Sequence, residues 1–338
     1  MEKSGTSFLY KLLPILLFGL SIPLSMLLWI GNISYAAITN NSEGLYQFSV
    51  IPPTRWLVAT LGPMFFIAYG LKQKSIDYSG ALLGFVTGFL LALSNYIFFT
   101  CLIAFFVSSS RATKFRQHLK SKIEDDFKEG GQRNWIQVLC NGGMVTQLSI
   151  LFILDCGCEE RPINFATDYR GSWLSIAVLG AFACCNGDTW ASELGTVIGK
   201  SEPRLITTLK KVPRGTNGGI SVVGLFVSFL GGLLIGLSQF CATILFVDSN
   251  ILANSPPQWP LILYGGFGGL FGSIIDSLLG ATLQYSGKSL RGKIVEVPGA
   301  NVKHISGRRI LDNHSVNLLS SIITALILPV LVNAVHNF

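Results

Sequence analysis

The architecture of this chain is indicated most directly by a glycine-rich apolar run, Gly265-Gly-Phe-Gly-Gly-Leu-Phe-Gly-Ser-Ile-Ile-Asp-Ser-Leu-Leu-Gly280. Small residues recur in it at steps of four, for example Gly265 with Gly269 and Gly268 with Gly272. Residues four apart share one face of a helix, and small residues there let two helix backbones approach closely within a bilayer. The run therefore predicts a membrane helix with one tightly packed face.

The composition of the whole chain agrees with a membrane environment. Of its 338 residues, 50% are hydrophobic and only 13% are charged, whereas soluble domains usually carry about 25% charged residues. A soluble protein of this size would lack the polar surface to cover its domains. The net charge of +7 is not arranged as a basic stripe interleaved with aromatic residues, so a nucleic-acid partner is not expected.

Apolar runs recur along the chain and predict an all-α, polytopic transmembrane helix bundle of about eight spans (seven to nine). One run, 80–108, is long enough for a single tilted helix or for two shorter helices joined at Ser94-Asn95. The runs are 12–30, 56–71, 80–108, 134–154, 173–198, 218–247, 260–284 and 314–335.

Basic residues predict which side of the membrane each connecting segment occupies. They gather in the segments 109–133, 199–217 and 285–313, which are therefore expected to be cytosolic. The segments between them, 155–172 and 248–259, hold few basic residues. Sequons at Asn32 and Asn40 favour a lumenal location for their loop and hence two helices within 80–108. The first run has no cleavage site and is expected to be a retained helix of an endomembrane protein, most simply in the endoplasmic reticulum.

Three acidic residues interrupt the predicted membrane runs: Asp188, Glu193 and Asp276. An ionised carboxylate near the bilayer centre costs about 2.5–3.5 kcal/mol. Three unpaired carboxylates would therefore remove much of a typical stability of about 5–15 kcal/mol. Each acid is expected to be paired, bound to a metal or close to the interface, and an ion pair with a basic residue at a helix end is the simplest arrangement.

A glycine-rich basic loop follows the first two acids. Its glycines leave backbone N–H groups free to turn toward one point, its polar side chains add donors, and the next helix start adds a positive partial charge. Together with nearby carboxylates, such a loop has the parts that bind a nucleotide polyphosphate with Mg²⁺. Packing alone also produces such loops, and no Walker A motif is present. The residues concerned are Lys210, Lys211, Arg214, Gly215, Thr216, Asn217, Gly218 and Gly219.

Asp276 lies on the small-residue face of its run and is expected to point into the bundle, where it would complete a metal site with Asp188. Gln284, two turns further on, is expected to share that face as a polar ligand. Asn141 and Asn313 stand at predicted helix starts, where capping or turn formation is the simpler role.

Six blocks of the sequence resemble the transmembrane protein 19 family, which includes plant phytyl-phosphate kinase. The resemblance extends in order from about Ser79 to the C-terminus, so 1–78 is expected to be an N-terminal pair of transmembrane helices and 79–338 the family's membrane domain. The blocks are Asn141–Gly143, Gly187–Gly195, Pro203–Thr208, Pro213–Gly219, Asp276–Gln284 and Asp312–Asn317.

The resemblance implies transfer of a phosphoryl group from a nucleoside triphosphate, CTP in particular, to an isoprenyl monophosphate. It implies Asp188, Glu193 and Asp276 as the catalytic group, with Asp188 and Asp276 holding Mg²⁺. Further substrate-binding residues implied by the matching blocks are Asn141, Thr207, Thr208, Gln284, Asn313 and Asn317. Thr207 and Thr208 belong to a rough counterpart of the Ser-Pro-Lys-Lys-Thr run of dolichol kinases and CDP-diacylglycerol synthases.

The chief alternative is a membrane transporter or flippase of an anionic or lipid-linked solute, because helices broken by glycine and intramembrane acids are typical of transporters. A catalytically silent scaffold is a third alternative, disfavoured by the number of polar groups on apolar helices. The isoprenoid chain length and the oligomeric state, including a homo-oligomer, stay open.

Overall fold

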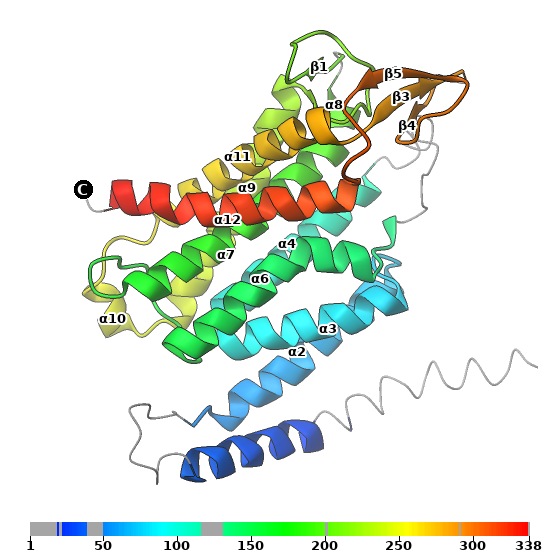
Figure 1. Cartoon of the computed structure of the whole chain (residues 1–338). Coiled ribbons are helices and arrows are strands. Elements are labelled where there is room, and N and C mark those ends of the chain that lie inside the picture. Colours follow the sequence, from blue (N-terminus) through cyan, green and yellow to red (C-terminus); the bar gives the residue numbers. More distant parts are fainter. Residues whose placement is uncertain are drawn as a thin grey trace, which may run out of the picture.

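The computed structural model describes residues 19, 22–38, 50–115, 131–199, 202–290 and 292–336. These residues form a helical bundle with short strands gathered at one end (Figure 1). Its helices are Ile22–Ile38, α2 (Pro53–Lys72), α3 (Tyr78–Ser94), α4 (Tyr96–Lys114), α6 (Trp135–Cys156), α7 (Tyr169–Trp190), the π-helix η2 (Ala191–Gly195), α8 (Thr196–Ile198), α9 (Val222–Phe246), α10 (Ser249–Ala253), α11 (Pro260–Leu283) and α12 (Asn313–His336).

The predicted helical membrane architecture is confirmed. Among the described residues, five helices are long and apolar enough to cross a membrane, namely α4, α6, α9, α11 and α12. Ile22–Ile38 and α3 are shorter apolar helices. The predicted total number of spans stays a prediction, and part of the first run, Asn40, Lys200 and most basic residues of 109–133 lie outside the described residues.

The long run 80–108 is divided into two helices at Asn95. This residue is extended, with φ −162° and ψ 125°, and its backbone N–H ends α3 by donating to Leu91 O. Its side-chain Oδ1 accepts a 2.8 Å hydrogen bond from Ile97 N and so caps the start of α4. The two helices form a hairpin that brings the end of α4 back beside the segment before α3, because Lys114 at the end of α4 donates to the Gln73 carbonyl.

Helices α7, α9 and α11 pack with their backbones in contact. A Cβ placed on Gly187 of α7 would lie 2.7 Å from Gly269 O of α11, and one placed on Gly269 would lie 2.6 Å from Ser228 O of α9. These distances are well inside van der Waals contact, so only glycine allows the approach. The predicted small-residue face of 265–280 is therefore the place where three helices meet.

The large apolar side chains pack on the other side of α7. Phe98 of α4, Phe152 of α6 and Phe182 of α7 are fully buried in one continuous cluster. The rings of Phe98 and Phe152 meet edge to face at 5.1 Å, a favourable aromatic geometry. The bundle thus has a backbone-packed part around α7, α9 and α11 and a side-chain-packed part around α4, α6 and α7.

The strands were not predicted, and they modify the all-α expectation in the connecting segments. β1 (Arg204–Leu205) pairs antiparallel with β2 (Gly219–Ile220), and β3 (Ser286–Ser289) pairs antiparallel with β4 (Ile294–Val295) and β5 (Val302–Ser306). All lie at one end of the bundle, whereas α10 lies at the other (Figure 1). Strands of two to five residues are too short to leave a periodic signal in the sequence.

The end opposite the strands is closed by a buried ion pair. Arg55 at the start of α2 binds Glu160 at 2.7 Å, with side-chain exposures of 6% and 11%. Glu160 also accepts a hydrogen bond from Tyr96 N, and the Arg55 guanidinium lies 4.4 Å from the centre of the Tyr96 ring. The pair therefore joins α2, the break between α3 and α4, and the segment that follows α6.

Candidate functional site

The structure brings Asp188 and Asp276 together at the strand-bearing end of the bundle. One turn earlier on each helix, α7 meets α11, since a Cβ on Gly272 would lie 2.5 Å from Cys184 Cβ. Each aspartate stands four residues after that contact on its own helix. Asp188 accordingly lies within electrostatic range of Asp276, and also of Glu193. The three acids singled out in the sequence form one partly buried group.

Helix α12 supplies the polar partners of Asp276. Ser320 Oγ donates a 3.0 Å hydrogen bond to Asp276 Oδ2. The Asn317 amide, oriented with its nitrogen toward the carboxylate, donates to the same oxygen at 3.2 Å and to Asn313 O at 3.0 Å. Asn317 and Asn313 thus join the acidic group, Asn317 through its side chain and Asn313 through its backbone carbonyl.

The end of α7 is held by Asn186, a fully buried side chain two residues before Asp188. Its Nδ2 donates to Gly231 O of α9 at 2.8 Å, and its Oδ1 accepts from Ser108 Oγ of α4 at 2.8 Å. Both ends of the amide are therefore used to join α7 to its neighbours. A polar amide next to Gly-Asp inside an apolar run was the available signal for this role.

Beyond Trp190, the helix changes to the π form in η2. π-helical turns are rare and often occur at functional sites. Glu193 lies in this π turn, within electrostatic range of both Asp188 and Arg133.

Arg133, just before α6, is a cation within electrostatic range of Glu193. Its Nη1 donates to Ser110 Oγ at 2.9 Å and its Nη2 to Ser109 Oγ at 3.1 Å, both at the end of α4. Burial lowers the pKa of the Arg133 guanidinium, and the nearby Glu193 carboxylate partly offsets this effect. In the sequence, Arg133 was only one of several basic residues in 109–133, so its position was missed.

The glycine-rich loop is docked against the strands. Gly215 and Gly218 have φ of +85° and +77°, values that favour glycine. The Thr216 hydroxyl donates to Pro213 O at 2.7 Å, and Asn217 donates through its backbone N to Ser286 Oγ at 3.0 Å. Gly219 N donates to Thr216 O within the loop. The Thr216 hydroxyl and the backbone N–H groups of Asn217 and Gly219, which were expected to face a ligand, therefore have partners within the protein.

The expected place of Gln284 is corrected by the structure. Helix α11 ends at Leu283, and Gln284 is an extended residue after it, so it does not continue the face of Asp276. Its Nε2 donates to Glu296 Oε1 at 2.9 Å, and Asn217 Nδ2 donates to the same oxygen at 3.3 Å. Gln284 therefore supports the glycine-rich loop through Glu296.

The basic residues ahead of that loop lie on an exposed turn between β1 and β2. Arg204 Nη1 donates to Leu209 O at 2.8 Å and shapes the turn. Thr207, Thr208, Lys210 and Lys211 are exposed, and Arg214 is partly buried. Within the described part of the chain, no ion pair engages Lys210, Lys211 or Arg214, and the structure does not bring them into contact with the acids. They are available to an anion that comes from the aqueous side.

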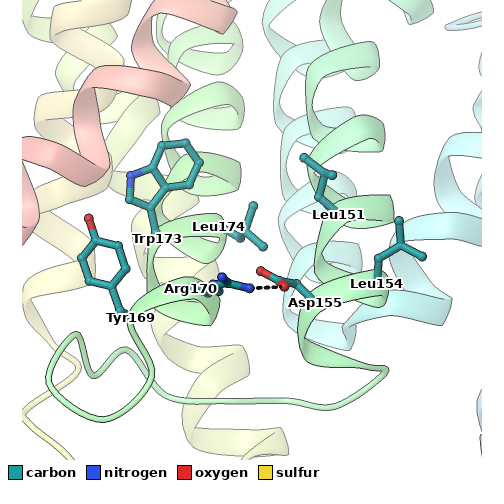
Figure 2. A pocket seen from close by; sticks show the side chains of 7 residues that line it. All are labelled: Leu151, Leu154, Asp155, Tyr169, Arg170, Trp173 and Leu174. Atoms are coloured by element: carbon teal, nitrogen blue, oxygen red, sulfur yellow. Dashed lines mark hydrogen bonds and ion pairs between the residues drawn. The ribbon is translucent and has the colours of Figure 1, made fainter. Parts of the chain in front are cut away.

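Two further features of the described residues limit the site. Among the described residues, no group of three or more His, Cys, Asp or Glu side chains is arranged to hold a metal by itself. One cavity, of about 430 Å³, lies between the end of α6 and the start of α7. Figure 2 shows Tyr169 and Trp173 beside the Arg170–Asp155 ion pair of 2.8 Å in its wall. That end of α7 is far along the helix from Asp188, so this cavity is separate from the acidic group.

Comparison with known proteins supplies the family. A family model described as "Integral membrane protein DUF92" matches residues 61–325. The chain belongs to this family. Protein PGR of Arabidopsis thaliana is 41% identical over 255 residues, which cover 75% of this chain and 88% of that protein. These findings confirm the family resemblance seen in the sequence.

More distant members share the same region. An uncharacterised membrane protein of Methanocaldococcus jannaschii is 27% identical over 76% of this chain and 85% of its own length. One from Synechocystis is 27% identical over 57% of this chain and 66% of its own length. No solved structure matches the chain. Every site residue named above lies within the part matched by the DUF92 model.

Proposed function

We propose that this multi-pass DUF92 protein is an isoprenyl-phosphate kinase that uses a nucleoside triphosphate, CTP in particular. The observation that carries the proposal is the meeting of Asp188 and Asp276 at one end of the bundle, with Arg133 close to their neighbour Glu193. Carboxylates for a hard cation, a cation for phosphate and membrane helices for a lipid are the parts that this reaction needs.

The acidic residues fit a magnesium ion that is shared with substrate. Mg²⁺ in phosphoryl-transfer sites is usually held by one or two carboxylates together with substrate phosphates and water. Asp188 and Asp276 would supply two carboxylates, and the hydrogen bonds from Ser320 and Asn317 would fix the orientation of Asp276. The ion would neutralise charge on the transferred phosphoryl group. A third protein carboxylate is not required for such a site.

The reaction needs positioning more than a strong base. An oxygen of the isoprenyl monophosphate is already anionic and attacks the terminal phosphorus of the nucleotide. The bond from that phosphorus to the bridging oxygen breaks, which gives the isoprenyl diphosphate and a nucleoside diphosphate. Lys210, Lys211 and Arg214 would attract the nucleotide phosphates, and the backbone from Gly215 to Gly219 would border them. Exposed cations suit a soluble nucleotide that comes from the cytosol.

The experiment that tests the proposal compares Asp188→Asn with Asp155→Asn in purified, detergent-solubilised protein. With farnesyl or phytyl monophosphate, Mg²⁺ and labelled CTP, the wild type should form the diphosphate. Asp188→Asn should lose about 100-fold or more in turnover, the usual cost of removing one electrostatic contributor at a reaction centre. Asp155→Asn makes the same substitution in the exposed ion pair at the opposite end and should keep full turnover.

Full activity of Asp188→Asn would remove that residue from the mechanism. Absence of turnover on any isoprenyl phosphate, together with solute flux in liposomes, would favour the transporter. The interruption of α7 by η2 is the observation that speaks for that second candidate, since transporters place binding sites at broken helices.

A further inference from the structure

A narrow apolar cavity lies between α2, α3, α4 and α6, and Arg133 is among its lining residues. Its volume is about 80 Å³. Its walls are carbon-rich and include Phe66 of α2, Phe99 and Phe106 of α4, and Ile76 before α3. Gly142 of α6 borders it as well, and because glycine has no side chain, it leaves the space beside it open. We call this cavity the slot.

The slot has polar lining residues on its α6 side. Arg133, Gln137 and Asn141 form this polar rim. The Asn141 carbonyl accepts a hydrogen bond from Cys185 Sγ of α7 at 3.6 Å, so this rim lies against the helix that carries Asp188. Apolar walls that lead to the Arg133 cation are complementary to a ligand with a hydrocarbon chain and an anionic head.

A continuous series of charged groups connects this rim with the acidic group. Arg133 lies within electrostatic range of Glu193, and Glu193 lies within range of Asp188. The serines that hold Arg133 belong to the same turn of α4 as Ser108, which binds Asn186 next to the acids. A phosphate bound by Arg133 would therefore lie at the edge of the site and not within a separate part of the bundle.

We propose that the slot binds the first isoprene units of a single-chain lipid monophosphate and that Arg133 binds its phosphate. The reaction at that phosphate rests on the proposed function, whereas the binding does not. An arginine matches phosphate because two of its N–H groups can bind two oxygens at once. The small volume admits one thin chain and excludes a two-chain phospholipid, and the rest of the chain would extend into the bilayer. Asn141, which lies within α6 and not at the helix start expected from the sequence, also lines the slot and gains a place in the same subsite.

The test measures binding without nucleotide, so that it does not depend on turnover. Farnesyl monophosphate, farnesol, inorganic phosphate and phosphatidic acid are titrated separately into the detergent-solubilised full chain. Farnesyl monophosphate should bind at least about tenfold more tightly than each of the others, since it alone offers both one chain and a phosphate. Equal affinity for phosphatidic acid would overturn the single-chain assignment.

Two glycine variants of α6 test the slot. A Cβ at Gly142 has only an ordinary contact, 3.5 Å from Thr87 Cγ2, and a Cβ at Gly143 is 3.5 Å from Leu139 Cδ1. Gly142→Leu should therefore fold, fill the slot and weaken farnesyl monophosphate and farnesol by about tenfold or more. Gly143→Leu makes the same change one residue away, outside the slot lining, and should bind both as the wild type does. Equal binding by the two variants would refute the slot.

Arg133→Gln and Arg133→Lys test the head group. Arg133→Gln should bind farnesyl monophosphate no better than farnesol, and Arg133→Lys should recover part of the difference. If Arg133→Gln keeps the wild-type preference, the phosphate assignment is wrong. If the protein binds farnesyl monophosphate selectively but has no kinase activity, the proposed function is rejected and the slot is retained. If the protein is an active kinase but the two glycine variants bind farnesyl monophosphate equally, the slot is rejected and the proposed function is retained.

Discussion

Ser320 on α12 and Asp276 on α11 are joined by a hydrogen bond of 3.0 Å from the serine hydroxyl to the carboxylate Oδ2. The contact fixes one of the two aspartates at the candidate site from a helix distant in sequence. Asn317, one turn earlier on α12, reaches the same oxygen. The orientation of Asp276 is therefore set by α12, although that helix contributes no acid to the site.

Replacement of Ser320 by alanine should loosen Asp276 without removing its charge. We expect Ser320→Ala to lower kcat by about tenfold, the equivalent of one hydrogen bond to a charged group, and to raise the Mg²⁺ concentration needed for half-maximal activity. Ser321→Ala is the matched control, because that hydroxyl donates only to Leu318 O within its own helix. Ser320→Thr should restore part of the activity. An unchanged magnesium dependence in Ser320→Ala would contradict a positioning role.

The buried amide of Asn186 predicts a loss of stability. Asn186→Ala leaves Gly231 O and Ser108 Oγ without their partner, and each unsatisfied buried group costs about 1–3 kcal/mol. Thermal unfolding in detergent should show a clearly lower midpoint. Asn254→Ala, at an exposed amide of the opposite end that binds Asn250 O, should change stability by no more than about 0.5 kcal/mol. Similar midpoints for the two variants would show that the Asn186 bridge contributes little.

The glycine contact among three helices predicts opposite signs for two similar substitutions. Gly269→Ala would place its Cβ 2.6 Å from Ser228 O, and such overpacking costs about 1–3 kcal/mol. Gly143→Ala meets only Leu139 Cδ1 at 3.5 Å and should be neutral or stabilising by up to about 1 kcal/mol, because alanine favours helix more than glycine does. Unfolding temperatures of both variants in the same detergent check this. A stabilised Gly269→Ala protein would disprove the backbone contact between α9 and α11.

The ion pair of Arg55 and Glu160 should contribute far more than the pair of Arg170 and Asp155. Removing one partner from a buried pair costs about 3–5 kcal/mol, since the other charge remains buried and unpaired. Glu160→Gln should therefore strongly lower the unfolding temperature. Arg170 and Asp155 are 77% and 37% exposed, so Arg170→Gln should cost at most about 1 kcal/mol. Equal effects would mean that water reaches Arg55.

Local chemistry explains which features the sequence could predict. The break at Asn95 was predictable because asparagine caps helices and interrupts an apolar run that is too long for one span. The glycine face of α11 was predictable from its repeat of four. The acids were conspicuous because charge within an apolar run is costly.

The remaining features depend on tertiary contacts. The π turn that contains Glu193 has no sequence signature, and Arg133 acquires its position through serines of α4. Gln284 was expected to continue the helix because no glycine or proline marks the end of α11 at Leu283. The strands were missed because strands of two to five residues are too short to show a clear alternation.

The contact of α7, α9 and α11 through bare backbone has a consequence for how this protein could diversify. A helix interface without side chains has no rotamers that can adjust to a substitution. The distance between Asp188 and Asp276 is therefore set by the contact between the helix backbones and can change very little. The slot, by contrast, is walled mainly by interchangeable apolar side chains of α2 and α4. Relatives could therefore come to accept different lipids through substitutions in those walls while the carboxylate spacing is inherited unchanged.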